Sequence, residues 1–305
     1  MNYETATTEE LIEYAKKLKR EKNCFVIAHN YEPIEVLKIA DFIGDSLQMA
    51  KVAAETDAKM IMLCGIKIMG ETTKILNPDK KVIMSHPDAD CQLANMKTPD
   101  ALTELKQKHP NAEVVCYVNS PATLKAESTI TCTSSNAVNL VSKIPDDKPI
   151  IFVPDCNIGA WASYKTGREL IMFDSFCYVH DQITVEDVKV IRAKHPNHFL
   201  VVHPECKLEV CKKADFVFST GQMIDFVKDN DNVIIGTEYG LYEQLAWQHP
   251  EKDLVPLSPK MVCADMQKTT LKGAVEALEN ENYEVELPAE IMQKTLTSLN
   301  RMFNF

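Results

Sequence analysis

The sequence CFVIAHNYEP at residues 24–33 is a run of apolar residues that ends abruptly in polar ones. Two later stretches follow the same pattern: EVVCYVNSPA at residues 113–122 and FLVVHPECKL at residues 199–208. A short and continuously apolar run is typical of a strand buried on both faces of a parallel sheet. We therefore predict that each stretch is a buried parallel strand that leads into a polar loop.

The three stretches recur at a nearly constant spacing. Their first polar positions, His29, Tyr117 and His203, are 88 and 86 residues apart. Seventeen residues beyond each of them lies a hydroxyl, where apolar residues resume with helical spacing: Ser46, Ser134 and Thr220. A fixed period of this kind indicates one structural unit that is used three times.

Each period also contains further apolar runs that alternate with helical patterns, such as MIMLCG at 60–65, PIIFVPD at 149–155 and NVIIGTE at 232–238. Such alternation predicts an α/β fold in which parallel sheets are covered by helices. We expect three α/β/α units related by a pseudo-threefold axis, with the active site at that axis. The expected boundaries are 24–112, 113–198 and 199–284, with an N-terminal helix in 1–23 and a C-terminal helix in 285–305. Thr7 followed by Glu10 predicts a capping box at the first helix.

Composition narrows the class of protein. The formal net charge of −11 over 305 residues disfavours nucleic-acid binding, which needs a basic face. No apolar run approaches the ~18 residues that span a bilayer, and the N-terminus lacks the apolar stretch of a signal peptide. We therefore expect a cytoplasmic protein whose ten cysteines are reduced.

Three of the cysteines follow the repeat, because Cys91, Cys177 and Cys263 are separated by 86 residues each time. Three convergent thiolates suggest a metal site. Zinc takes four protein ligands in a structural site, or three and a water in a catalytic one. A 4Fe–4S cubane suits threefold symmetry better, since three cysteines would hold three irons and leave the fourth as a Lewis acid. The alternative is three structural cysteines. Cys206 and Cys211 have no partners on the period, and we expect them to pack on one helix.

A set of ordered motifs makes the sequence more specific. It resembles the quinolinate synthase family in motifs that run from about Ala28 to Met266, among them H-x-Y at 29–31, ADFIGDSL at 40–47, YVNS at 117–120, TSSNAV at 133–138, CYVH at 177–180, HPEC at 203–206 and GTEYG at 236–240. Members of that family are pseudo-threefold α/β/α proteins with a 4Fe–4S cluster on three cysteines. They condense iminoaspartate with dihydroxyacetone phosphate to quinolinate, phosphate and water in NAD biosynthesis.

The resemblance implies a set of site residues. One cluster per chain would be held by Cys91, Cys177 and Cys263, and catalysis would use Tyr31, His203 and Glu205. The implied substrate contacts are His29, Tyr31, Ser46, Tyr117, Asn119, Ser134, His203, Glu205 and Thr220. A functional partner would be an aspartate oxidase or dehydrogenase that produces iminoaspartate.

Each of these assignments has a structural alternative. The three hydroxyls would bind anionic substrates at helix N-termini, or would be ordinary N-caps worth roughly 1 kcal/mol each. His29 and His203 would bind ligand at the carboxyl ends of strands, or would be core histidines. Each of the three strand ends presents two polar residues: His29 and Tyr31, Tyr117 and Asn119, and His203 and Glu205. Among these six, Glu205 is the only carboxylate, which favours a general base over a structural ion pair.

Two rival functions also stay open. Another iron–sulfur hydro-lyase would share the open iron but need no phosphate pocket. A non-enzymatic iron or redox sensor would need no polar strand ends around a cluster, and the acidic charge argues against the nucleic-acid surface that such sensors use.

Overall fold

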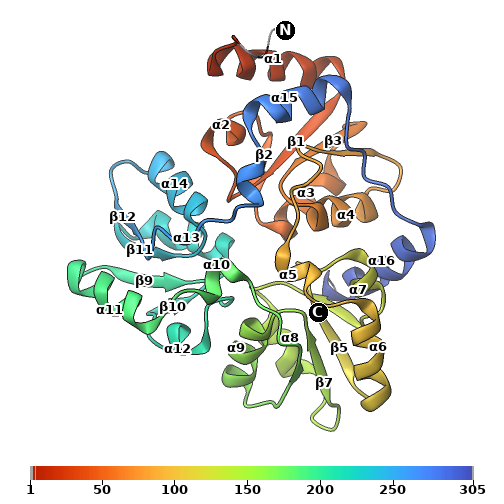
Figure 1. Ribbon diagram of the computed structural model, residues 1–305, viewed down its shortest axis with the longest axis vertical. Coiled ribbons are helices and arrows are strands. Elements are labelled where there is room, and N and C mark those ends of the chain that lie inside the picture. Colours follow the sequence, from red (N-terminus) through yellow and green to blue (C-terminus); the bar gives the residue numbers. More distant parts are fainter. Residues whose placement is uncertain (1–2, 4, 304–305) are drawn as a thin grey trace. The chain divides into compact units, whose positions relative to one another are not determined.

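The computed structural model describes residue 3 and residues 5–303 (Figure 1). The described part of the chain forms two compact units. The first contains the residues up to Cys91 together with Cys263–Pro288. The second contains Gln92–Val262 and the residues from Ala289 onward.

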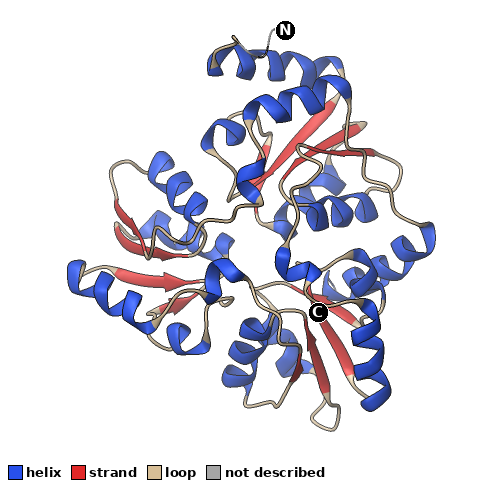
Figure 2. Cartoon of the chain, viewed as in Figure 1, coloured by secondary structure: helices blue, strands red, loops and turns tan. Residues whose placement is uncertain are grey.

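The described residues form three four-stranded parallel sheets that are covered by helices, as the sequence predicts (Figure 2). Each sheet has the same strand order: second, first, third and fourth strand of its set. The first compact unit holds β1 (Cys24–His29), β2 (Phe42–Gly44), β3 (Met60–Cys64) and β4 (Lys81–Met84). The second holds two sheets, one of β5 (Glu113–Tyr117), β6 (Ile130–Cys132), β7 (Ile150–Val153) and β8 (Ile171–Met172), the other of β9 (Phe199–Val202), β10 (Phe216–Val217), β11 (Asn232–Gly236) and β12 (Asp253–Pro256).

The strand register repeats with the spacing seen in the sequence. The first strand of each set pairs with the second through equivalent residues: Ile27 with Phe42, Val115 with Ile130, and Val201 with Phe216. A side-chain acceptor just before the second strand also receives an amide N–H of the first: Val26 to Asp41 at 2.8 Å, Val114 to Thr129 at 3.1 Å, and Leu200 to Asp215 at 2.7 Å. The three sheets are therefore built by one local design.

Helices of the first compact unit pack around its sheet. They are α1 (Thr8–Glu21), α2 (Ile34–Leu37), α3 (Ser46–Glu55), α4 (Lys67–Leu76), the 3-10 turn η1 (Met266–Lys268) and α15 (Leu271–Asn280). The predicted capping box at Thr7 and Glu10 is confirmed. Apolar residues of α1, including Leu11 and Leu18, are buried with residues of β1 and α15 in one core cluster. Thus α15 belongs to the first compact unit, although it lies within residues 199–284, the range that we expected to form the third α/β/α unit.

The second compact unit contains the remaining described helices. They are α5 (Gln92–Asn95), α6 (Pro99–Lys108), α7 (Ala122–Ala126), α8 (Ala137–Lys143), α9 (Cys156–Thr166), α10 (Tyr178–Asp181), α11 (Val185–Lys194), α12 (Leu208–Cys211), α13 (Thr220–Asp229), α14 (Tyr239–Gln248) and α16 (Ala289–Phe303). The C-terminal α16 packs on α7 and on the edge strand β6. Ser298 Oγ donates to the carbonyl of Lys125 at 3.0 Å and Thr295 Oγ1 to that of Ala122 at 2.8 Å.

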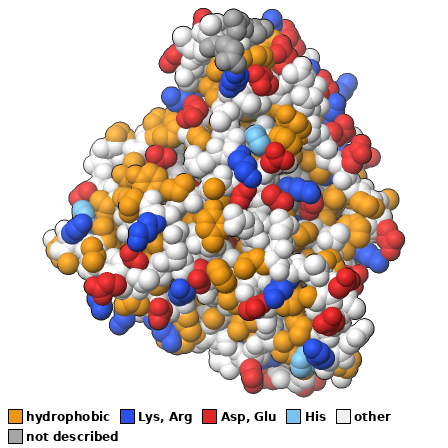
Figure 3. All heavy atoms as spheres, in the orientation of Figure 1, with side chains coloured by type: hydrophobic (Ala, Val, Ile, Leu, Met, Phe, Trp, Pro, Cys, Tyr) orange, Lys and Arg blue, Asp and Glu red, His pale blue; other side chains and the backbone are white. Residues whose placement is uncertain are grey.

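One face of the molecule carries charged side chains of both signs (Figure 3). On the face shown in Figure 3, acidic and basic side chains are interspersed. Among the described residues, no helix is both long enough and apolar enough to cross a bilayer.

Candidate active site

The three predicted polar positions lie at equivalent strand ends. His29 is the last residue of β1, Tyr117 is the last residue of β5, and His203 directly follows β9. All three are buried. Since these are carboxyl ends of parallel strands, where α/β proteins bind ligands, each sheet presents its polar residue at the edge that suits a site.

The polar turns after these strands share a hydrogen-bonding pattern. The amide of Tyr31 donates to His29 Nδ1 at 3.3 Å, and the amide of Glu205 approaches His203 Nδ1 at 3.4 Å. In the second turn, Asn119 Nδ2 donates to the Tyr117 hydroxyl at 3.0 Å. Each turn therefore holds two predicted site residues against each other.

The structure argues against the N-cap interpretation of two predicted hydroxyls. Ser46 and Thr220 are the first residues of α3 and α13, and the caps are Asp45 and Ser219. Both caps form capping boxes with the helix amides. Helix capping therefore does not account for Ser46 or Thr220. Ser134 lies in the turn before α8.

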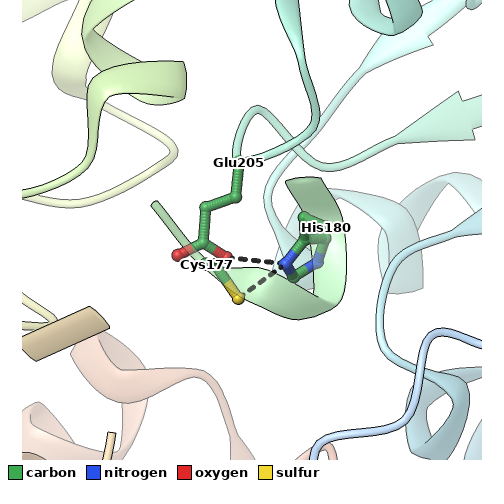
Figure 4. Close-up of side chains that lie close together, drawn as sticks. All are labelled: Cys177, His180 and Glu205. Carbon is green, nitrogen blue, oxygen red and sulfur yellow. Dashed lines mark hydrogen bonds and ion pairs between the residues drawn. The ribbon is translucent and has the colours of Figure 1, made fainter. Parts of the chain in front are cut away.

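Within the second compact unit, the short helix α10 brings a thiol and an imidazole to the turn after β9. His180 Nδ1 lies 3.2 Å from Cys177 Sγ and 3.1 Å from Glu205 Oε2 (Figure 4). On the other side of the ring, His180 Nε2 lies 2.9 Å from Thr237 Oγ1. Two separate segments of the sequence, one with Cys177 and His180 and the other with Glu205, thus meet at one point.

Further groups surround the Glu205 carboxylate. His203 Nδ1 lies 3.1 Å from Glu205 Oε2, and the Tyr117 side chain also hydrogen-bonds to Glu205. Asn157 Nδ2 donates to the Glu205 carbonyl at 3.0 Å. The structure therefore brings together four of the predicted site residues in this unit, Tyr117, Cys177, His203 and Glu205.

The electrostatics of this cluster favour an ionised Glu205. Burial alone would raise the pKa of Glu205, but His180 and His203 beside the carboxylate offset this effect and leave the pKa below its usual value. Burial lowers the pKa of His180 to about 4, against the opposing attraction of Glu205. At neutral pH the His180–Glu205 contact is therefore a hydrogen bond between a neutral imidazole and a carboxylate, rather than an ion pair.

A second buried carboxyl group lies behind the cluster. Asp155 caps α9 and accepts the amides of Ile158 at 2.8 Å and Cys177 at 3.2 Å. Burial and the nearby Glu205 charge raise the pKa of Asp155 well above its usual value. Asp155 thus anchors the backbone at Cys177, and the Asp155 carboxyl group itself favours the protonated form.

The order Thr237–His180–Glu205 is a hydroxyl, an imidazole and a carboxylate in hydrogen-bond contact. In such an arrangement the carboxylate orients the imidazole, which takes a proton from the hydroxyl or returns one. The repeat and the motifs did not mark His180, Thr237 and Asp155 as site residues. The available signal was the C-x-x-H spacing of Cys177 and His180, which places both on one helical turn.

The first compact unit holds the other predicted residues. The rings of His29 and Tyr31 meet edge to face at 4.5 Å between centroids. Asn30 is fully buried, and its side-chain amide has no hydrogen-bond partner among the described residues. A buried amide without a partner costs about 1–3 kcal/mol. Asn30 is therefore a further polar group at this strand end that a ligand would satisfy.

The three periodic cysteines differ from most of the others. Cys91, Cys177 and Cys263 are partly exposed, as is Cys156, the first residue of α9. The strand cysteines are buried: Cys24, Cys64, Cys116 and Cys132. Cys206 and Cys211 are buried too, but the prediction that they share a helix is wrong, because Cys206 precedes α12 and only Cys211 lies on it.

Local contacts connect the chain segments that carry two of the periodic cysteines. Within the first compact unit, Lys268 Nζ donates to the carbonyl of Asp88 at 2.7 Å and also bonds Asp265 Oδ1 at 2.7 Å. The chain segments that carry Cys91 and Cys263 are thereby joined. The meeting of these two cysteines with Cys177 stays a prediction.

Comparison with known proteins adds an independent finding. A family model described as "Quinolinate synthetase A protein" matches residues 13–304. The chain is 45% identical over 289 residues to "Quinolinate synthase" of Caldicellulosiruptor bescii, covering 94% of this chain and 95% of that protein. It is 44% identical to "Quinolinate synthase" of Alkaliphilus metalliredigens, covering 96% and 97%.

A comparison with solved structures gives a weak similarity. It is the E-1-hydroxy-2-methyl-but-2-enyl-4-diphosphate reductase of Plasmodium falciparum, with 15% identity, a TM-score of 0.36 and coverage of 90% of this chain and 94% of that chain. At this TM-score the similarity supports no functional argument.

Proposed function

Because the chain belongs to the quinolinate synthetase A family, we propose that it condenses iminoaspartate with dihydroxyacetone phosphate to quinolinate, phosphate and water. The single observation that carries the proposal is the cluster of Tyr117, His203, Glu205 and Cys177. These residues were picked from the sequence motifs, and they meet in the second compact unit. The sequence motifs and the geometry of the second compact unit thus support the same residues.

The same proposal assigns one 4Fe–4S cluster to Cys91, Cys177 and Cys263. The donor set suits such a group, since these thiols are partly exposed whereas the strand cysteines are buried. Cluster iron is normally bound by thiolates. When bound, the group would supply a Lewis-acid iron for a substrate oxygen.

Glu205 is proposed as the general base. At neutral pH its carboxylate is ionised, and His203 and His180 fix its orientation. A positioned carboxylate of this kind can remove a proton next to a carbonyl, a step that the condensation requires. Tyr117, which hydrogen-bonds to Glu205, would orient the carboxylate from the side of β5.

The neutral His180 is proposed to exchange a proton with the Thr237 hydroxyl. His180 Nε2 faces this hydroxyl at 2.9 Å, while Nδ1 faces the Glu205 carboxylate. A hydroxyl so placed could take a proton from the substrate while its own proton passes to His180 Nε2, and the imidazolium, paired with Glu205, could return that proton through Thr237 to the leaving oxygen in the dehydration steps. Tyr31, at the buried end of β1, is proposed as a second proton donor.

Both substrates are anionic, and helix N-termini bind anions through free amides and the helix dipole. Ser46 and Thr220 begin α3 and α13, and their hydroxyls are not the capping groups. We assign them, with Ser134, to the substrate carboxylates and phosphate. His29 and Asn119 complete the proposed contacts at their strand ends.

The proposal also includes the cellular setting. Free iminoaspartate would come from an aspartate oxidase or dehydrogenase, and the protein would work in the cytoplasm, where thiols stay reduced. The ten cysteines, which are all free thiols in the structure, support this setting.

The decisive test is an anaerobic assay. Protein reconstituted with iron and sulfide is mixed with enzymatically generated iminoaspartate and dihydroxyacetone phosphate, and quinolinate is measured by chromatography. We expect quinolinate only when both substrates are present. A preparation that carries four irons per chain and dehydrates a hydroxy acid, but never forms quinolinate, would favour the hydro-lyase alternative.

A further inference from the structure

The contact between Cys177, His180 and Glu205 has the dimensions of a metal site. One ligand atom from each residue lies within 4.8 Å of the other two. His180 Nδ1 is 3.2 Å from the Cys177 sulfur and 3.1 Å from Glu205 Oε2. Tetrahedral zinc, with bonds of roughly 2.0–2.3 Å, places its ligand atoms about 3.3–3.6 Å apart. The two His180 distances need to lengthen by only a few tenths of an ångström to admit a cation.

The groups behind the three ligands match those that support a metal site. Thr237 Oγ1 holds the outer ring nitrogen of His180 at 2.9 Å, and His203 Nδ1 bonds the Glu205 carboxylate at 3.1 Å. Asp155 accepts the amide of Cys177 at 3.2 Å. Metal ligands are usually fixed by such outer hydrogen bonds, and their loss lowers metal affinity about 10–100-fold.

The donor types also select a class of cation. A thiolate, an imidazole and a carboxylate suit Zn²⁺, Co²⁺ or Fe²⁺ better than Mg²⁺ or Ca²⁺, which prefer oxygen ligands. One thiolate and one carboxylate would balance the two charges of the cation. His180 and Glu205 are buried while Cys177 is partly exposed. The fourth position of a tetrahedral site would therefore lie on the open side, beside Cys177.

From these contacts we propose that the protein without its iron–sulfur cluster binds one Zn²⁺ ion through Cys177, His180 and Glu205. This site rests on the geometry of the second compact unit and needs neither Cys91 nor Cys263. It shares Cys177 with the cluster assigned above, so zinc and a three-cysteine cluster exclude each other. Zinc bound here also occupies His180 Nδ1 and Glu205. Without zinc, these two groups support the proposed proton exchange between His180 and Thr237.

The experiment uses the full chain, prepared free of cluster under anaerobic and reducing conditions. Co²⁺ serves as the spectroscopic probe, because tetrahedral Co²⁺ with a thiolate ligand absorbs strongly in the visible and near-ultraviolet. We expect one equivalent of Co²⁺ per chain with both types of band, displaced by one equivalent of Zn²⁺. Six-coordinate spectra, or no bound equivalent, would overturn the proposal.

Variants locate the cation. His180→Ala and the isosteric Glu205→Gln should each weaken Co²⁺ binding at least ~10-fold, and Thr237→Val should weaken it by about that factor. The matched control is Cys91→Ser combined with Cys263→Ser, which removes the other two periodic thiols and should bind as the wild type does. Circular dichroism checks that each variant is folded, and if His180→Ala is not, Glu205→Gln carries the test.

The control also separates this site from the cluster assignment. Tetrahedral Co²⁺ that is lost in the Cys91→Ser, Cys263→Ser protein would place the cation at the three cysteines and refute the proposed site. Tetrahedral Co²⁺ that survives Glu205→Gln and His180→Ala at full affinity would refute it as well. In neither case would the assay for quinolinate be affected, so the two proposals fail independently.

Discussion

The turns after β5 and β9 show how one backbone design carries two kinds of chemistry. Both belong to the second compact unit, follow the first strand of their sheets and begin at equivalent positions, Tyr117 and His203. The β5 turn presents a phenol and an amide, whereas the β9 turn presents an imidazole and a carboxylate. The repeat therefore determines where a side chain stands, and the residue type at that position determines what it can do.

Among the substitutions that test this comparison, the loss of a periodic thiol should have the largest effect, because it should remove the cluster. Cys177 follows the β5 sheet and is partly exposed, whereas Cys206, in the β9 turn, is fully buried. Anaerobically purified wild-type protein should carry about four irons per chain, Cys177→Ser should carry none, and Cys206→Ser should match the wild type. Iron and acid-labile sulfide analysis provides the measurement. A cluster that persists without Cys177 would refute the ligand assignment.

Removal of the Glu205 carboxylate, which has no counterpart in the β5 turn, should have the next largest effect. Glu205→Gln preserves size and hydrogen bonding but not charge, so we expect quinolinate formation to fall at least ~10²-fold in kcat with the cluster retained. Asn119→Ala, in the equivalent turn, should mainly raise KM because it removes a binding contact. An effect of Glu205→Gln on KM alone, with kcat unchanged, would make Glu205 a binding residue instead of a base.

The buried His180 gives a pH dependence of stability. Its pKa in the folded protein is lowered to about 4 by burial, against about 6.5 in an unfolded chain. The unfolded state therefore binds more protons between these values, so this contribution to stability is complete above pH 6.5 and is lost as the pH falls towards 4.

Thermal melts of the cluster-free protein test this directly. Between pH 6.5 and 4.5, the wild type should lose at least about 2 °C more in Tm than His180→Gln, which cannot gain the proton. Equal losses in the two proteins would mean that His180 is not buried in its neutral form. Asp155, whose pKa is raised, contributes in the opposite direction in both proteins and cancels in the comparison.

The sequence revealed the repeat because each first strand is mostly buried and a polar residue stands at its end or directly after it, which leaves a clear pattern of residue types. It did not reveal the fourth strand of each sheet. β8 is two residues long, and β4 and β12 are four residues long and begin with charged residues, so none of them leaves a long apolar run. Edge strands need fewer apolar residues, since one side of each has no neighbouring strand.

The candidate site was predicted only as far as the motifs and the period extend. Tyr117, His203, Glu205 and Cys177 follow from them, whereas His180 and Thr237 have no equivalent partners on the period. Their role depends on α10 turning His180 toward the β9 sheet, a contact between distant segments. The packing of α15 on α1 was missed for the same reason, because a periodic sequence gives the units but not which helices lie side by side.

The smallest expected effect concerns the side chain just before the second strand of each sheet, which accepts a hydrogen bond from an amide of the first strand. The buried amide of Val114 donates to the Thr129 hydroxyl, and that of Leu200 donates to the Asp215 carboxylate. A hydrogen bond to a charged group contributes more than one between neutral groups, so Asp215→Ala should cost about 2 kcal/mol and Thr129→Ala about 1 kcal/mol. These values correspond to Tm decreases of about 4 °C and 2 °C.

Thr297→Ala is the matched control, since the Thr297 hydroxyl bonds only within the exposed face of α16, and its Tm should change by less than about 1 °C. Asp215 also bonds Arg192 at 2.9 Å, but this partly exposed ion pair adds little. Arg192→Ala should therefore cost less than Asp215→Ala. If Arg192→Ala proves equally costly, the ion pair, and not the strand amide, accounts for Asp215, and the third sheet is then held together differently from the second.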